Sequence, residues 1–270
     1  MSDLAHLKIW DDPAIRDSLS WYLEVAANRR PAKCRIASTL ATHIDPAASS
    51  EAALWAELDR LTPIFVRRWQ AIRAGASLPA TADGSSLLEL CRELAYRMLA
   101  HCNFCAWELA LIESNAPMLW NSNFFITLES MKILRVLTDV WLPDFKFGPG
   151  RCAMALAKTP WYWETVTGNL ALIAEWGEDF SIRHLVMPNH VECCTYPVLE
   201  WIAEHVPAVP VNVMAQFHPD NFCDPASTKY RNKYAEIARR PSRTELNMSW
   251  RRARELGLKF ETTTFERSPH

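Results

Sequence analysis

Asp144 and Lys146 follow a short apolar run in the segment DVWLPDFKFGPG, which extends from Asp139 to Gly150. Residues two apart on an extended chain point to the same side, so this carboxylate and this ammonium group would face one pocket. A lysine suits a carboxylate or phosphate of a ligand, and an aspartate suits an amine or a hydroxyl. Gly148 and Gly150 would then let the backbone turn away. The segment by itself is equally compatible with the solvated end of a strand.

Polar residues also follow the other predicted strands of the chain. They are Asn121, Ser122 and Asn123 after the first strand, Asn189 and His190 after the third, and Gln216, His218 and Asp220 after the fourth. Amides and hydroxyls can orient a ribose or an amino-acid group. Because this pattern recurs at four successive strand ends, it predicts the rim of a ligand pocket. The alternative is that they are ordinary polar residues of strand–helix loops.

The eight cysteines are a second possible source of chemistry. The candidate metal ligands are Cys102 and Cys105, which form a C-x2-C pair, the adjacent Cys193 and Cys194, and Cys223. Cys152, Cys193, Cys194 and Cys223 each fall in a predicted loop after a strand, so their thiolates could hold zinc or an iron–sulfur cluster. Adjacent cysteines are not expected to bind one ion together. The alternative is that these cysteines are small buried apolar residues.

Composition excludes some kinds of partner. The chain has 270 residues, 49% of them hydrophobic and 22% charged, which is ordinary for a soluble globular protein. Its net charge of −2 gives no field that would attract nucleic acid or an anionic membrane. The N-terminus lacks a secretion signal, and no apolar stretch is long enough to span a membrane. We therefore expect a cytoplasmic protein with reduced thiols.

Helices are predicted for the N-terminal region, residues 1–105. The apolar spacing predicts one helix over 12–30, a second starting after Ser50 and a third around residues 65–72. The stretch 74–85 is rich in Gly, Ala, Ser and Pro and is typical of a loop. Ser86 and Glu89 then form a capping box for a further helix.

Strands and helices alternate in residues 106–270. The predicted strands are 118–120, 140–145, 182–187, 209–217 and 259–265, and the predicted helices are 127–137, 160–176, 196–205 and 242–256. Such alternation builds a parallel sheet, and the ligand site of a parallel sheet lies at the C-terminal ends of its strands. The polar residues that follow the strands would therefore lie at one edge.

Several long motifs in this second region resemble those of one protein family. They are LWNSNFF, DVWLPDFKFGPGRCA, TPWYWETVTGNL, SIRHLVMPNHVECC, VPVNVMAQFHPDNFC and ARELGLKFE. They are similar to the radical S-adenosylmethionine (SAM) proteins related to pyruvate formate-lyase activating enzymes. The resemblance covers Leu111 to Glu266 and, more weakly, the region up to His101–Cys105.

The resemblance implies a fold and a chemistry. The implied fold is α/β, a partial (β/α) barrel of parallel strands that follows the N-terminal helical region. The implied cofactors are SAM and a [4Fe–4S] cluster, at which SAM is cleaved reductively to a deoxyadenosyl radical that abstracts hydrogen from a substrate. By position, Asn121, Ser122, Asn123, Asp144, Lys146 and His218 would face SAM or the substrate, with Pro188 and Asn189 closing the pocket.

The sequence departs from the family in one respect. The family binds its cluster through C-x3-C-x2-C, which leaves one iron open for SAM, and this chain has no such triplet. After Cys102 and Cys105 the chain passes directly into the equivalent of the fourth barrel strand. The first three strands, with the cluster loop and the glycine-rich SAM turn, have no counterpart.

Three functions are compatible with these residues. The first is a radical SAM protein by descent whose activity is impaired because its cluster half is missing, through an internal deletion, an error in the gene model, or supply of the cluster by another chain. The second is a non-catalytic module that binds a small molecule or a metal ion. The third is an unrelated barrel lyase or hydrolase that uses Asp144, Lys146 and His218 for acid–base chemistry, which the long matching motifs disfavour.

Partners are expected from the fold. A protein or a small molecule would be the substrate. The strand edges and apolar inner face that a half barrel exposes imply aggregation, dimerisation with a second copy of the chain, or coverage by the N-terminal helices. No catalytic residue is assigned.

Overall fold

The computed structural model describes residues 12–99 and 115–261. Contacts divide the described chain into two compact units. One contains Ser20–Trp120 and Thr127–Val140, and the other contains the residues up to Leu19, Asn121–Ile126 and the chain from Trp141 onward. The predicted boundary between residues 105 and 106 falls outside the described residues and stays a prediction.

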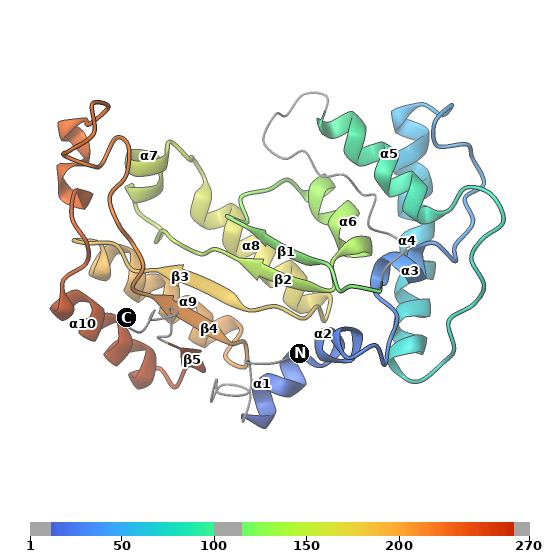
Figure 1. The fold of residues 1–270 in the computed structure, drawn as a ribbon, viewed down its shortest axis with the longest axis horizontal. Helices are drawn as coiled ribbons and strands as arrows, with labels where there is room; N and C mark the ends of the chain where they lie inside the picture. Colours follow the sequence, from blue (N-terminus) through green and yellow to red (C-terminus); the bar gives the residue numbers. More distant parts are fainter. Residues whose placement is uncertain (1–11, 100–114, 262–270) are drawn as a thin grey trace, which may run out of the picture. The chain divides into compact units, whose positions relative to one another are not determined.

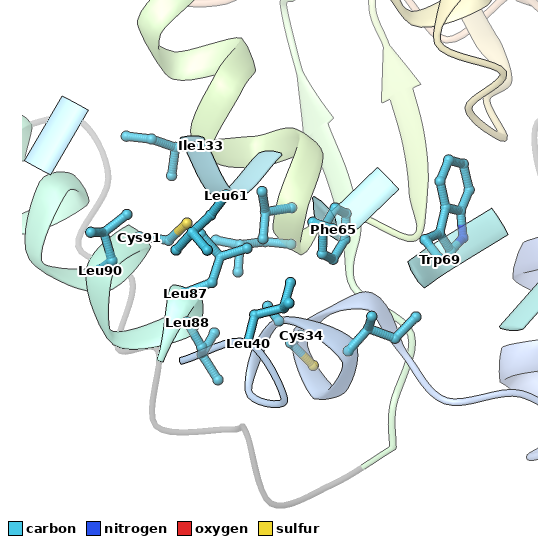
Figure 2. Packing of buried hydrophobic residues seen from close by; sticks show 14 of the residues in the cluster. Cys34, Leu40, Leu61, Phe65, Trp69, Leu87, Leu88, Leu90, Cys91 and Ile133 are labelled. Atoms are coloured by element: carbon cyan, nitrogen blue, oxygen red, sulfur yellow. The ribbon is translucent and has the colours of Figure 1, made fainter. Parts of the chain in front are cut away.

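The first unit is a helical core. Its helices are α2 (Ser20–Ala26), α3 (Lys33–Ala37), α4 (Glu51–Arg73), α5 (Leu87–Leu99) and α6 (Leu128–Leu137). Figure 2 shows how Leu61, Phe65 and Trp69 of α4 meet residues of α3, α5 and α6 in one apolar cluster. These side chains are at most 2% exposed. Burial of this apolar face supplies most of the stability of such helices.

Helix α4 corrects one prediction. Residues 51–73 form a single helix, whereas the sequence predicts two helices separated near Pro63. The buried positions Leu54, Leu58 and Leu61 continue into Phe65, Trp69 and Ile72 on the same face. A proline in a helix interior costs about 3 kcal/mol, and the continuous buried face on both sides of Pro63 offsets that cost. Ser50 caps the helix as predicted, because its side chain accepts from the Ala53 N–H.

The predicted helix over residues 12–30 is also interrupted. Helix α1 covers Pro13–Ser18 and α2 begins at Ser20. The break coincides with the boundary between the two units at Leu19. Asp12 caps α1, and at the start of α5 Glu89 accepts the Ser86 N–H as the predicted capping box requires.

The parallel strands lie mainly in the second unit, since of their residues only Leu119, Trp120 and Val140 belong to the first (Figure 1). The strands are β1 (Leu119–Ser122), β2 (Val140–Pro143), β3 (Ile182–Leu185), β4 (Val211–Met214) and β5 (Phe260–Glu261), each at a predicted position. Strands β3, β4 and β5 pair in parallel, with Ile182 opposite Val211 and Val211 opposite Phe260. Parallel bridges join Trp141 to Phe180 and Asp144 to Arg183, so β2 runs beside β3 in the same direction. The Asp144 N–H donates to the Ser122 carbonyl of β1.

Helices follow these strands, and three of them lie where the sequence predicts helices, at 160–176, 196–205 and 242–256, whereas Cys152, Cys193 and Cys194, predicted in loops, lie in helical segments. The helices are α7 (Cys152–Ala157), α8 (Tyr162–Glu175), α9 (Tyr196–His205) and α10 (Arg243–Glu255), with a π-helical segment η2 (Val191–Thr195) and a 3-10 segment η3 (Asn232–Ile237). Ser242 and Glu245 form a capping box at the start of α10. Gly177 and Gly257 end α8 and α10 at φ of 68° and 67°. The fold is thus mixed helix and sheet with short parallel strands, and barrel curvature stays a prediction. No described helix is long and apolar enough to cross a membrane.

Candidate functional site

Asp144 is the centre of a charged group that lies at the C-terminal ends of β1 and β2 and beside Arg183 within β3. Its Oδ1 accepts from Arg183 Nε at 2.7 Å and lies 2.6 Å from Arg183 Nη2, and its Oδ2 lies 2.9 Å from Lys146 Nζ. Arg183 Nη2 also donates to Asn121 Oδ1 at 2.6 Å. We call these four residues the strand-end cluster. The Asp144 side chain is 9% exposed, whereas those of Arg183 and Lys146 are 24% and 30% exposed. Two cations around one carboxylate leave a net positive charge that partly faces solvent.

Tyr162, the first residue of α8, holds the end of β2 in place. Its hydroxyl accepts the Lys146 N–H at 2.9 Å and donates to the Asp144 carbonyl at 3.1 Å. Burial raises the pKa of Tyr162, so the phenol keeps the proton that it donates. Its ring packs edge-on against Phe147 at 5.2 Å between centroids. Hydrogen bonds to the Tyr162 hydroxyl therefore fix the backbone at both Asp144 and Lys146.

His184 of β3 connects the end of β2 to the π-helical segment. The carbonyl of Phe145 can only accept, so Nδ1 of His184 donates to it at 2.7 Å, and Nε2 accepts from the Thr195 hydroxyl at 2.9 Å. The His184 side chain is fully buried. Burial lowers the pKa of His184 to about 4, so its imidazole is neutral at pH 7. The neutral ring fixes the segment that carries two cysteines.

A second group brings together three thiols and an imidazole. Cys152, His190, Cys193 and Cys194 each offer one ligand atom, and these atoms all lie within 4.8 Å of one another. Cys193 Sγ is 3.6 Å from Cys152 Sγ, 3.9 Å from Cys194 Sγ and 3.3 Å from His190 Nδ1. We call these residues the thiol–imidazole cluster. Cys194 and His190 are buried, Cys152 is partly exposed and Cys193 is exposed.

The π-helical segment explains how adjacent cysteines reach one point. The N–H groups of Cys194 and Thr195 both donate to the His190 carbonyl, at 3.0 and 3.2 Å, which widens the turn. The wider turn leaves the sulfurs of Cys193 and Cys194 on one side. The two sulfurs, 3.9 Å apart, are thus close enough to approach one ion, and the expectation that adjacent cysteines would not share an ion stays untested. Burial raises the pKa of both thiols and lowers that of His190, so the three groups are neutral when no ion is bound.

Other predicted residues have local partners. Ser122 Oγ and Asn123 Oδ1 accept the N–H groups of Phe124 and Phe125 in tight turns. Asn189, at φ 65°, donates from Nδ2 to the Glu236 carbonyl and accepts from Arg239 Nη2. His218 is exposed, with Nδ1 at 3.4 Å from the Pro219 carbonyl oxygen.

The remaining predicted cysteines lie elsewhere. Cys223 is partly exposed and, within residues 115–261, does not belong to the thiol–imidazole cluster. Cys102 and Cys105 lie outside the described residues.

No family model matches this chain. The "Uncharacterized protein MJ0674" of Methanocaldococcus jannaschii is 37% identical over 153 residues, which are 56% of this chain and 41% of that protein. The chain thus spans less than half the length of this curated relative. A crystal structure of a domain of pyruvate-formate lyase-activating enzyme from Bacteroides vulgatus is similar with a TM-score of 0.41 and 15% identity. That similarity covers 55% of this chain and 81% of the domain.

Of the members of the two clusters, Arg183 was not predicted to bind a ligand, whereas Cys152 was predicted as a possible zinc or iron–sulfur ligand and His190 as part of the pocket rim without a metal-binding role. Arg183 stands within a strand, so its pairing with Asp144 depends on the register between β2 and β3. Cys152 and His190 join Cys193 through contacts across 41 and 3 positions of sequence. The spacing H-x2-C-C at residues 190–194 was the one signal that could have pointed to His190. The strand-end cluster, with its excess positive charge, suits an anion, and the thiol–imidazole cluster suits a soft metal ion.

Proposed function

We propose that this chain binds SAM through the strand-end cluster, as a barrel half of the radical SAM type that does not cleave SAM by itself. The observation that carries the proposal is the convergence of Lys146 and Arg183 on Asp144. In open parallel sheets, ligands bind at this edge, beyond the carboxyl ends of the strands. The sequence resemblance over residues 111–266 supports SAM as the ligand.

The carboxylate of SAM is the group that these cations would bind. Asp144 already holds Arg183 and Lys146 at 2.6 and 2.9 Å, so little side-chain freedom is lost when an anion arrives. The cluster keeps one positive charge in excess, and a carboxylate neutralises it. Arg183 can present its planar guanidinium to two oxygens, and Lys146 acts as a point charge. Asn121, which accepts from Arg183, fixes the guanidinium plane.

The residues of this chain do not fit the family's [4Fe–4S] cluster. Three thiolates must each bind a different iron and leave a fourth iron open, and the C-x3-C-x2-C that supplies them is absent. The thiols of Cys152, Cys193 and Cys194 are too close together for that task, because ligands of three different irons are held apart by the width of the cluster. No radical step is therefore assigned to this chain.

Isothermal titration calorimetry with SAM and with decarboxylated SAM tests the proposal. Wild-type protein should bind SAM at least tenfold more tightly than the decarboxylated analogue, a difference of about 1.4 kcal/mol. Lys146→Met should remove most of that preference, because Asp144 then neutralises Arg183 and the cluster loses the excess positive charge that attracts the carboxylate. The matched control is Lys229→Met, since Lys229 is an exposed lysine of the same unit. It should keep the preference.

Two results would contradict the proposal. One is the absence of SAM binding, and the other is equal affinity for SAM and the decarboxylated analogue in the wild type. A separate assay for 5′-deoxyadenosine under reducing conditions should give no product. Product formation by the purified chain would show that a cluster is present and would overturn the non-catalytic part of the proposal.

A further inference from the structure

We propose that Cys152, His190, Cys193 and Cys194 bind one tetrahedral Zn²⁺ ion that ties the β2–α7 connection to the β3–α9 connection. This site is separate from the strand-end cluster and does not depend on SAM binding. The set is Cys3His, one of the ligand sets of structural zinc sites. Four protein ligands leave no open position, so the ion would have a structural role.

The observed distances match a tetrahedron around one ion. Zn–S and Zn–N bonds of about 2.3 and 2.0 Å place two sulfurs about 3.8 Å apart and a sulfur and a nitrogen about 3.5 Å apart. Cys193 Sγ lies 3.6 Å from Cys152 Sγ, 3.9 Å from Cys194 Sγ and 3.3 Å from His190 Nδ1. Three edges of the tetrahedron are thus present, and all ligand atoms are already within 4.8 Å.

The state of His190 supports the same conclusion independently. Its side chain is 6% exposed, and its Nε2 is a buried atom without a hydrogen-bond partner among the described residues. Glu236 Oε1 lies 3.8 Å from this nitrogen. If Nδ1 binds the ion, the proton must sit on Nε2, which then points toward the Glu236 carboxylate. A carboxylate behind a ligating histidine is the usual outer partner in zinc sites.

The segments that carry the ligands are held in place without the ion. Thr195, next to Cys194, is bonded to buried His184, and the two N–H bonds to the His190 carbonyl shape the π-helical turn. The Gly148 backbone packs against the Cys193 and Cys194 peptides. A preorganised set of this kind needs little rearrangement to bind metal.

The close sulfurs favour a single ion over the two other plausible states. In a [4Fe–4S] cluster each thiolate binds a different iron, so its thiolates are farther apart than thiolates that share one ion. A disulfide between Cys152 and Cys193 would need the sulfurs to move from 3.6 Å to about 2.0 Å, and it would leave Cys194 and His190 without a role. A single zinc ion would instead be bound by all three thiols and by the His190 imidazole.

Metal analysis of purified full-length chain tests the site. Protein prepared with zinc under reducing conditions should contain one zinc per chain by plasma mass spectrometry. Cys152→Ser and His190→Asn should lower zinc affinity at least a hundredfold in competition with a chelating dye. The controls are Cys223→Ser and the double variant Cys102→Ser with Cys105→Ser, which should keep one zinc per chain.

Two further measurements keep the test independent of folding. Cobalt substituted for zinc should give the intense visible bands of tetrahedral thiolate coordination, and these should change in Cys194→Ser. Glu236→Gln leaves all four ligands in place and should weaken zinc binding about tenfold to a hundredfold. The proposal is overturned if the wild type binds no stoichiometric zinc, if iron and sulfide are found in its place, if a Cys152–Cys193 disulfide is the stable state under reducing conditions, or if the control variants lose the metal.

Discussion

Gly148 packs directly against Cys193, so that a Cβ added at Gly148 would lie 2.1 Å from the Cys193 carbonyl oxygen. Gly150, two residues later, has nothing within 4 Å of such a Cβ. The two glycines of the GPG sequence therefore differ in what they do. Gly148 lets the β2–α7 connection approach the π-helical segment closely, and Gly150 does not.

Gly148→Ala should disturb the thiol–imidazole cluster, and Gly150→Ala should not. The methyl group would push the Cys193 peptide away, and overpacking of this kind costs about 1–3 kcal/mol. We expect a lower midpoint of thermal unfolding and weaker zinc binding for Gly148→Ala, measured by calorimetry and by dye competition. Equal behaviour of the two variants would contradict the close approach.

The second prediction concerns the dependence of stability on pH. In the unfolded chain His184 takes up a proton near pH 6.5, whereas in the folded protein its pKa is about 4. Between these values the unfolded state binds more protons, so the contribution of His184 is complete above pH 6.5 and is lost as pH falls to 4. A shift of this size is worth about 3 kcal/mol.

Urea unfolding from pH 7 to pH 4 measures this contribution. His184→Gln should be less stable than the wild type at pH 7, because the buried hydrogen bonds change. Its stability should also fall less steeply between pH 6.5 and 4, the interval set by the two pKa values. His218→Gln, which changes an exposed histidine, should retain the slope of the wild type. Parallel curves for the wild type and His184→Gln would rule out the low pKa.

Much of the fold could be predicted from the sequence, because local signals decide it. The five strands coincide with apolar runs, and Ser50, Ser86 and Ser242 stand at the helix starts that their spacing indicates. The continuity of α4 through Pro63 could not be predicted, since it depends on packing against α3 and α5. The sequence indicates that Pro63 destabilises a helix. It does not reveal the buried apolar contacts of α4 that offset this loss of stability.

The candidate sites were predicted less completely, because they depend on register and on distant contacts. Asp144 and Lys146 were found through their spacing, but Arg183 meets Asp144 across 39 positions of sequence. Asn189 was expected to bind the cofactor, which stays a prediction, and sequence spacing could not show that its side chain contacts Glu236 and Arg239, 47 and 50 positions later. The sulfurs of Cys193 and Cys194 lie close together because the chain forms a π-helical turn here. No residue type in the sequence predicts such a turn.

The third prediction concerns Asp144 as the residue that positions two cations. Asp144→Asn keeps the shape of the side chain and removes the charge that holds Arg183 and Lys146. Since both cations are partly exposed, we expect a modest loss of about 1–2 kcal/mol in unfolding free energy. SAM affinity should fall as well, because the cations are no longer held in place. Asp220→Asn, at an exposed turn, is the control and should change neither quantity.

The last prediction concerns Asp139, which organises the helical unit. Its Oδ1 accepts from Trp21 Nε1 and the Lys33 N–H, and its Oδ2 accepts from the Met118 N–H, each at 2.9 Å. The side chain is fully buried. One carboxylate thus joins α2, the start of α3 and the residue before β1. Burial raises the pKa of Asp139, and the three N–H donors act in the opposite direction.

Asp139→Asn should destabilise the protein by about 2–4 kcal/mol in chemical unfolding at pH 7, although it changes one atom. The amide offers one oxygen and one NH2 group, and whichever way it turns, the NH2 group faces at least one N–H donor. A buried donor then has no acceptor, which costs more than the lost bond itself. Asp45→Asn is a matched control, because the exposed Asp45 side chain accepts the Ala47 N–H through Oδ1, and an amide oxygen can accept it as well. Similar unfolding free energies for the two variants would mean that Asp139 does not hold these three segments together.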